Sequence, residues 1–193
     1  MENLALRVRQ TGARSIGISG IDCAGKSTLA DSLARELGGA VLVHGDAFTR
    51  PAAERHADPD EARGYYRDSF DYGFVYDELL PAVRRGFSGA LTTRVSDWER
   101  DEWRKTTIHI PPDAVVIVEG CFLYTGREDA FDLRIWIDIP FDVALARALR
   151  RPRDLERMGG AAGVRERYAT RYLPGQALHL ERDDPVGRAD IVL

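Results

Sequence analysis

Residues 14–27 read Arg-Ser-Ile-Gly-Ile-Ser-Gly-Ile-Asp-Cys-Ala-Gly-Lys-Ser, and this stretch decides the fold. Its second part, Gly20–Ser27, fits the pattern G-x-x-x-x-G-K-[ST]. An isoleucine-rich run precedes the first glycine, and apolar residues recur with helical spacing from Lys26 to Leu37. Where a glycine-rich turn joins a strand to a helix in this way, backbone N–H groups and the helix N-terminus face phosphate oxygens. The stretch therefore predicts a phosphate-binding loop, the P-loop, at Gly20–Ser27.

The P-loop pattern also predicts which residues hold a nucleotide. Lys26 supplies a compact positive charge for the β- and γ-phosphates, and the Ser27 hydroxyl is a ligand for Mg²⁺. The chain has only two lysines among its 27 basic residues, and one of them falls at this position. The predicted cofactors are thus ATP and Mg²⁺. The predicted ATP-binding residues are Gly20, Asp22, Cys23, Ala24, Gly25, Lys26, Ser27 and Thr28.

Short apolar runs alternate with longer helical patterns along the chain, which is typical of an α/β fold with a parallel sheet. We predict a single domain over 1–193, a P-loop NTPase three-layer αβα sandwich with a five-stranded parallel core sheet. A small extended hairpin is expected near 90–110, residues 152–163 read as a mobile segment, and Pro174 should end or kink a helix. The expected strands are 14–19, 40–44, 114–118, 133–139 and 189–193; the expected helices are 26–37, 58–70, 72–85, 140–150 and 164–173.

Composition excludes several classes of protein. The 193 residues are 44% hydrophobic and 30% charged, as in globular chains, and a net charge of −4 offers no basic field for nucleic acid or a membrane. No apolar run has the roughly 18–20 residues that span a bilayer, and no secretory signal is visible. Two cysteines cannot form a disulfide scaffold. We expect a cytoplasmic protein with a small-molecule substrate, and the sequence leaves a homo-oligomer open.

Two acidic residues lie where a phosphate site needs them. Glu119 follows the apolar run 114–118, so its carboxylate should lie at a strand end beside the P-loop and hold the metal together with Ser27. Asp46 follows the expected strand 40–44. A carboxylate at this edge of the sheet can accept the proton of an attacking hydroxyl. We therefore predict that Asp46 is the catalytic base and that Glu119 lies on the metal side.

These motifs together resemble the uridine kinase family of P-loop kinases, a branch that includes phosphoribulokinase and bacterial pantothenate kinase. The resemblance rests on GIDCAGKSTLA at 20–30, HGDAF at 44–48, SFDYGFVYDEL at 69–79, VVIVEG at 115–120 and ADIV at 189–192. It implies that the protein is a kinase and that Asp71 binds the ribose hydroxyls of the acceptor. The other expected acceptor-binding residues, in an acceptor-side insertion at about 47–110, are Phe48, Tyr72, Asp97 and Trp98.

The sequence departs from this family where the acceptor base is recognised. The family's uridine pocket uses Tyr-Asp-Phe followed by His, whereas this chain has Ser96, Asp97 and Trp98, with Asp101 or Glu102 in place of His. Lost hydrogen-bonding groups lower the discrimination between substrates. The predicted acceptor is a uridine- or cytidine-like nucleoside, and the first alternative is another small alcohol, pantothenate-like, ribosyl or a sugar phosphate. The second alternative is a regulatory protein that binds or hydrolyses ATP. The Asn-Lys-x-Asp motif of guanine-specific switches is excluded, because Asn3 is the single asparagine.

Eight arginines lie between Arg147 and Arg171, against three acidic residues, so this segment is basic within an acidic chain. Arginine offers a planar fork of donors that suits phosphate oxygens, and its charge does not titrate. We predict an arginine-rich lid at about 151–163 that closes over the triphosphate. The predicted catalytic residues are Asp46, Lys26, Arg147, Arg150 and Arg151, with Arg153 and Arg157 behind them.

Overall fold

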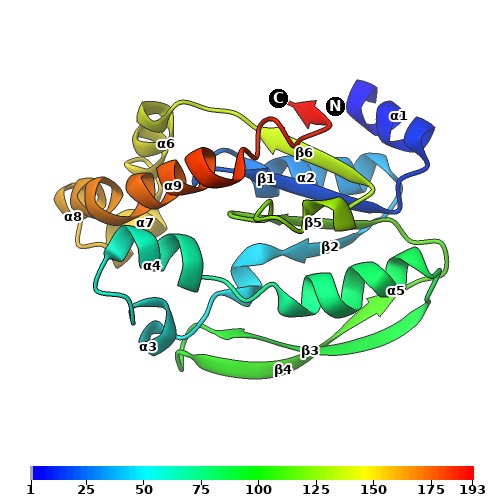
Figure 1. Cartoon of the computed structure of the whole chain (residues 1–193), viewed down its shortest axis with the longest axis horizontal. Coiled ribbons are helices and arrows are strands. Elements are labelled where there is room, and N and C mark those ends of the chain that lie inside the picture. Colours follow the sequence, from blue (N-terminus) through cyan, green and yellow to red (C-terminus); the bar gives the residue numbers. More distant parts are fainter. Residues whose placement is uncertain (1) are drawn as a thin grey trace.

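A parallel sheet forms the centre of the molecule (Figure 1). The computed structural model describes residues 2–193, with side chains from Leu4 onward. The strand order is β2-β5-β1-β6-β7, and every neighbouring pair is parallel. The predicted five-stranded sheet is confirmed, and its middle strand β1 leads directly into the P-loop. The bounds are β1 (Ser15–Gly20), β2 (Val41–His44), β5 (Val116–Gly120), β6 (Leu133–Ile137) and β7 (Ile191–Val192).

Helices cover both faces of the sheet, as its continuous apolar strands require. On one face, Ile16 and Ile18 of β1 share a core with apolar side chains of α1 (Glu2–Thr11) and α2 (Lys26–Glu36). On the other face, Val116 and Val118 of β5 share a core with those of α5 (Leu80–Arg84) and of the π-helical turn that precedes it (Val75–Leu79). Because successive strand residues point to opposite faces, each strand is buried on two sides. The predicted three-layer αβα sandwich is confirmed.

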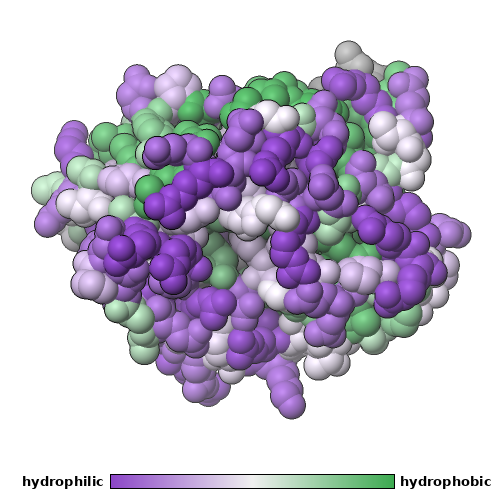
Figure 2. Space-filling model, viewed as in Figure 1, coloured by the Kyte–Doolittle hydropathy of each residue, from purple (hydrophilic) through white to green (hydrophobic). Residues whose placement is uncertain are grey.

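The remaining helices surround the carboxyl ends of the strands and the chain that follows. Their bounds are α3 (Ala52–Arg55), α4 (Glu61–Asp68), α6 (Phe141–Ala148), α7 (Pro152–Arg157), α8 (Ala161–Arg167) and α9 (Leu173–Asp183). The sequence pattern predicts neither α1 nor α3. Over residues 2–193, none of the helices combines the length and the apolar character that crossing a bilayer demands. Figure 2 shows hydrophilic residues over most of the visible face, with apolar residues in separate patches.

Two prolines of the C-terminal region, Pro152 and Pro174, lie in the first turns of helices. Pro152 begins α7, where the sequence suggested a mobile segment, because its fixed φ suits a first helical turn that needs no N–H donor. The sequence predicts that Pro174 ends or kinks a helix: it does not end one, but an irregular turn lies directly before it. The chain runs from α8 through a π-helical turn (Tyr168–Tyr172) into α9, and Pro174 lies in the first turn of α9. The π-helical turn shifts the backbone hydrogen bonds by one residue just before the proline. The helix can therefore continue although Pro174 has no N–H to donate.

The extended pieces near 90–110 are longer than expected. β3 (Gly89–Asp97) and β4 (Glu102–Ile110) form an antiparallel hairpin of nine residues on each side. The hairpin is a separate sheet and lies apart from the central one in Figure 1. Ser96 Oγ donates to the Thr49 carbonyl oxygen and so joins β3 to the chain that follows β2. The tip of the hairpin, which carries Trp98 and Asp101, is thereby fixed beside the carboxyl end of β2.

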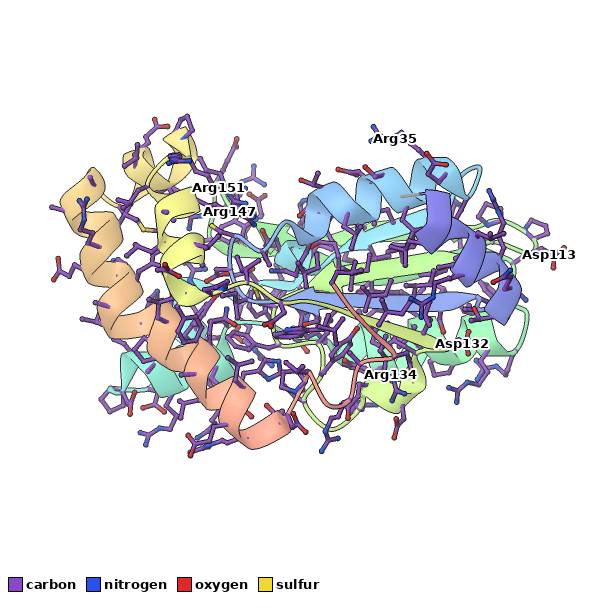
Figure 3. All side chains as sticks on the ribbon, turned by 90° about the horizontal axis from the view of Figure 1, so that it is seen from above. Arg35, Asp113, Asp132, Arg134, Arg147 and Arg151 are labelled. Carbon is purple, nitrogen blue, oxygen red and sulfur yellow. The ribbon has the colours of Figure 1, made fainter. Side chains whose placement is uncertain are left out.

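Two side chains secure the opposite end of the sheet (Figure 3). Asp132 Oδ2 accepts from the backbone N–H groups of Arg14 and Ser15 at 3.0 and 2.9 Å and from Ser15 Oγ at 2.8 Å. Arg134 donates through Nε and Nη2 to the two carboxylate oxygens of Asp190, at 3.0 and 2.8 Å. These bonds fix the start of β1 and the approach to β7. The strand that leads into the P-loop is therefore held in place at its start.

Candidate active site

The P-loop turns tightly between β1 and α2. Cys23 has φ 59° and Gly25 has φ 104°, and both values lie in the left-handed region. Within residues 2–193 no side chain caps the N-terminus of α2, so its first N–H groups can receive an anion. A small cavity of about 90 Å³ lies in front of the loop. The predicted nucleotide-binding residues that line it are Asp22, Cys23, Gly25, Lys26, Ser27 and Thr28.

Gly20 and Ala24, the other two predicted ATP-binding residues, lie outside the lining of the small cavity. A Cβ at Gly20 would lie 2.7 Å from the Ile137 carbonyl oxygen, so the glycine allows β6 to approach the loop closely. Ala24 is buried in the core next to it. Both residues shape the loop from behind.

Lys26 is held in the small cavity by a network of neighbours. Its Nζ donates to the Ile21 carbonyl oxygen at 2.8 Å and to Cys121 Sγ at 3.2 Å. Cys121 Sγ donates to Asp22 Oδ1 at 3.2 Å, and the Tyr65 hydroxyl donates to Asp22 Oδ2 at 2.7 Å. Burial alone would lower the pKa of Lys26, but Cys121 and Asp22 raise it. The ammonium therefore stays charged and can exchange the Ile21 carbonyl for a phosphate oxygen.

Ser27 and Glu119, the two residues predicted to hold a metal, lie next to each other. Ser27 Oγ donates to Glu119 Oε1 at 3.2 Å, and His44 Nδ1 lies 2.9 Å from the same oxygen. Strand register produces this arrangement, because Glu119 lies opposite Ile18 of β1 and His44 of β2. Mg²⁺ takes one or two protein oxygens and completes its shell with phosphate oxygens and water. A hydroxyl and a carboxylate at hydrogen-bond distance, beside a P-loop, fit that ion.

Asp46 lies where two cavities meet. A large cavity of about 910 Å³ adjoins the small one, and Asp46 lines both of them, together with Asp22, Cys23, Arg151 and Arg153. A Cβ at Gly45 would lie 2.8 Å from the Glu119 carbonyl oxygen, so only glycine lets the 3-10 turn Gly45–Phe48 rest directly on β5. The Asp46 carboxylate is thereby placed between a phosphate-binding loop and a space large enough for a small metabolite.

Of the five residues predicted to bind the acceptor, the structure brings only Trp98 to the large cavity. Phe48 is buried in the core, and Tyr72 stacks behind the lining residue Phe70 with ring centroids 5.6 Å apart. Asp97 accepts from the N–H groups of Glu99 and Arg100 and thus holds the hairpin turn.

Asp71 also lies outside the lining of the large cavity and is engaged by arginine. Arg94 Nη2 donates to Asp71 Oδ2 at 2.6 Å, and Arg50 Nη2 lies 3.8 Å from Oδ1. Burial alone would raise the pKa of Asp71, but the hydrogen bond from Arg94 lowers it. Its role in binding an acceptor stays a prediction.

The predicted catalytic arginines separate into three groups. Arg151 lines both cavities, whereas Arg150 is exposed and lines neither. Arg147 Nη1 donates to the carbonyl oxygens of Cys23 and Ala24, each at 3.0 Å, and so holds the P-loop backbone. Figure 3 shows Arg147 and Arg151 between α6 and the N-terminal end of α2.

Helix α7, which lies in the segment predicted to be a lid, contacts the hairpin tip. The guanidinium of Arg157, which lines the large cavity, lies 5.2 Å from the ring centroid of Trp98. Arg55 lies 5.6 Å from the same ring. Trp98 therefore lies in cation–π contact with both α7 and α3.

Sequence reasoning left out most of the wall of the large cavity. The residues that it did not assign include Arg55, His56, Ser69, Phe70, Asp101, Arg167, Tyr168, Arg171 and Tyr172. One signal was present, because an Arg-Tyr pair at 167–168 recurs four residues later at 171–172. Residues four apart lie near one another on a helix, so the repeat indicates one polar, aromatic face.

The family model described as Phosphoribulokinase / Uridine kinase family matches residues 15–173. The chain belongs to this family. The uridine kinase of Proteus mirabilis (strain HI4320) is 28% identical over 145 residues, covering 70% of this chain and 67% of the relative. The uridine kinase of Brevibacillus brevis is 25% identical over 187 residues, covering 92% of this chain and 83% of the relative. A solved structure from Bacillus stearothermophilus, titled a possible uridine kinase, has a TM-score of 0.76 and 24% identity and covers all of this chain.

Membership of the phosphoribulokinase and uridine kinase family explains the nucleotide-binding loop of the site. Membership makes the chain a P-loop kinase with a nucleotide-binding loop, which confirms the resemblance seen in the sequence. The match spans 96% of the chain in that solved structure, which has the same fold. The matched range begins at the first residue of β1 and ends at the first residue of α9. It includes the P-loop, Asp46, Glu119 and the whole wall of the large cavity.

Proposed function

We propose that this P-loop kinase transfers the γ-phosphoryl group of ATP to a hydroxyl of a small metabolite. The observation that carries the proposal is the position of Asp46, whose side chain lines both the small cavity at the P-loop and the large cavity beside it. An acceptor in the large cavity would present its hydroxyl to Asp46 and to a triphosphate at the same time. Holding both reactants in this way supplies much of the rate of phosphoryl transfer.

Each residue of the site has a distinct part in the reaction. Lys26 and the N–H groups at the start of α2 bind the β- and γ-phosphates, and Arg151 adds charge from the lid. Asp46 orients the acceptor hydroxyl and takes its proton. The hydroxyl oxygen forms a bond to the γ-phosphorus while the bond from that phosphorus to the β–γ bridging oxygen breaks, and ADP leaves with the electron pair. Ser27 and Glu119 would hold Mg²⁺, which supplies positive charge to the phosphate oxygens.

The acceptor lies in one of two classes. A nucleoside is supported by the names of the curated relatives. Another small alcohol is supported by the cavity wall, because Phe48, Asp71, Tyr72 and Asp97 lie outside it and Trp98 alone remains of the expected nucleoside-binding set. The two buried free thiols, Cys23 and Cys121, agree with a reducing compartment, and the cytoplasm is part of the proposal.

The proposal is tested by incubating the protein with ATP, Mg²⁺ and a panel of nucleosides and small alcohols, and reading phosphorylated products by mass spectrometry. At least one compound should become phosphorylated and should raise ADP release above slow hydrolysis. ADP release that no compound stimulates would favour an ATP-hydrolysing regulatory protein instead.

A single substitution tests the proposed role of Asp46. Asp46→Asn should keep the affinity for ATP and lower phosphoryl transfer by about 10²–10⁴-fold, the usual contribution of a general base. The exposed Asp142 of α6 provides a matched Asp142→Asn control that should be fully active. Transfer at the wild-type rate by Asp46→Asn would remove this carboxylate from the reaction.

A further inference from the structure

Five basic side chains line the large cavity without lining the small one. They are Arg55, His56, Arg157, Arg167 and Arg171. They come from four different segments: α3 and the residue after it, α7, α8 and the π-helical turn before α9. A triphosphate bound at the P-loop would be reached by Arg151 and Arg153, which line both cavities. The five basic side chains therefore face the space in which the acceptor would lie.

The acidic residues of the large cavity do not balance this charge. Asp101 lies 3.4 Å from Arg55 Nη1, and Asp154 lies 3.6 Å from Arg153 Nε. Asp22 and Asp46, the other carboxylates in the wall, lie at the P-loop side, where they also line the small cavity. Four arginines line the large cavity but not the small one, and three of these have no carboxylate within 4.0 Å among residues 4–193, namely Arg157, Arg167 and Arg171.

Arg171 is the most informative of the three. It is only 3% exposed, and its guanidinium donates to the carbonyl oxygens of Arg55 and Glu61 at 3.0 and 3.2 Å. The donors are satisfied by neutral carbonyl oxygens, the Tyr65 ring centroid lies 5.4 Å from the guanidinium, and the Glu61 carboxylate acts on its charge only from beyond ion-pair distance. The buried charge therefore has no ion-pair partner, which costs free energy. A ligand anion would supply that partner.

The pKa of His56 is shifted by the same positive charges. Burial lowers the pKa of His56, and the charges of Arg171, Arg55 and Arg167 lower it further. The imidazole is therefore neutral near pH 7 and can accept or donate one hydrogen bond without adding to the positive charge.

We propose that the acceptor is an anionic hydroxy compound whose phosphate or carboxylate group binds Arg167 and Arg171 while its hydroxyl faces Asp46. The proposal rests on the kinase function above and specifies its substrate class. A neutral nucleoside would leave the two guanidiniums without a counter-charge. Arg167 is exposed and faces the cavity, so it can form the bidentate pair that arginine makes with planar or tetrahedral oxyanions.

The first test measures anion binding without knowledge of the substrate. The small cavity is filled with Mg²⁺ and a non-hydrolysable ATP analogue, and inorganic phosphate or acetate is then titrated at constant ionic strength while the melting temperature is followed. At least one anion should stabilise the wild-type complex, and the response to phosphate against acetate indicates which group the site prefers. Arg167→Gln should lose the effect. Arg165→Gln should retain it, because Arg165 is exposed on the same helix and does not line the cavity. No stabilisation of the wild type, or equal stabilisation of Arg167→Gln, overturns the proposal.

The second test compares neutral sugars with anionic derivatives: ribose with ribose 5-phosphate, and glucose with gluconate, with uridine as a neutral reference. The charged member of a pair should have a kcat/KM about tenfold or more above its neutral partner, as expected for a charge-assisted contact with arginine. Arg167→Gln should remove that preference without changing the KM for ATP. Equal use of a neutral partner, or preferred use of uridine, overturns the proposal. If no acceptor stimulates ADP release, the kinase function fails, and the anion titration still decides whether the binding site exists.

Discussion

The contact between Arg147 and the P-loop makes a prediction that separates two neighbouring arginines. Sequence reasoning assigns Arg147 and Arg150 the same catalytic role, but the structure joins only Arg147 to the loop. We expect Arg147→Gln to weaken ATP binding, because the carbonyl oxygens of Cys23 and Ala24 lose their shared donor. Arg150→Gln should behave as wild type, because Arg150 is exposed and lines neither cavity.

The size of the effect follows from the geometry. A hydrogen bond from a charged donor is worth about 1.5–3 kcal/mol when it is well shielded. Arg147 is exposed, so water competes for its guanidinium and the two bonds together are worth roughly 1–2 kcal/mol. Cys23 also holds a left-handed φ of 59°, which costs a non-glycine residue about 1–2 kcal/mol and favours relaxation once Arg147 is lost. Since 1.4 kcal/mol is about a factor of ten, the Kd for ATP should rise about 5–30-fold.

The assay is isothermal titration with Mg²⁺ and a non-hydrolysable ATP analogue, followed by steady-state kinetics. In Arg147→Gln the KM for ATP should rise with the Kd, while kcat at saturating ATP should change less, because the variant disturbs the loop and leaves Asp46 in place. A Kd for Arg147→Gln equal to that of wild type would refute the reasoning. So would an equal loss in Arg150→Gln, since general loss of positive charge would then explain both.

Two predictions concern stability. The buried Tyr124 hydroxyl donates to the Gly17 carbonyl oxygen at 2.7 Å and accepts from the Ile135 N–H at 2.9 Å, so Tyr124→Phe should lower the free energy of unfolding by about 2–4 kcal/mol in urea titrations. An unchanged urea midpoint would show that these strands do not need the hydroxyl. Burial lowers the pKa of His179 below its ordinary value of 6.5, so the unfolded chain binds the proton more tightly than the folded one. Stability should therefore be unaffected by this residue above about pH 7 and should fall as the pH drops through about 6.5 toward 5. Unfolding midpoints of His179→Gln should depend less steeply on pH over this range, and an identical slope would contradict the idea.

Much of the fold could be predicted because its signals are local. The strands and the P-loop lie in consecutive residues, so steric preference and spacing are visible without knowledge of distant contacts. The path of the chain at Pro174 has no such local signal, because the sequence pattern does not announce the π-helical turn at Tyr168–Tyr172, where Tyr168 and Arg171 are buried. Pro152 is also ambiguous from the sequence, since a proline can either break a helix or begin one.

The candidate site also has a part that could be predicted from the sequence and a part that could not. Glu119 lies at the end of β5, Asp46 comes just after β2, and the loop after β1 leads to Lys26 and Ser27. Parallel strands bring their carboxyl ends to one edge of the sheet. Their grouping could therefore be predicted. Asp71 shows the limit of this reasoning, because its motif matches while its carboxylate is held by Arg94.

The sequence by itself determined the sheet, the nucleotide loop and the two carboxylates beside it, because those features depend on short segments with strong local preferences. Only the tertiary structure decided which arginine contacts the loop, which arginines line each cavity and which one faces solvent. Arg147 supports the loop, Arg151 reaches both cavities, Arg150 faces solvent, and Arg167 and Arg171 line the large cavity. Arginine side chains are long and similar, so their roles depend on where distant helices place them and on which carboxylates lie nearby. Those positions result from packing between segments far apart in the chain, which no local pattern records.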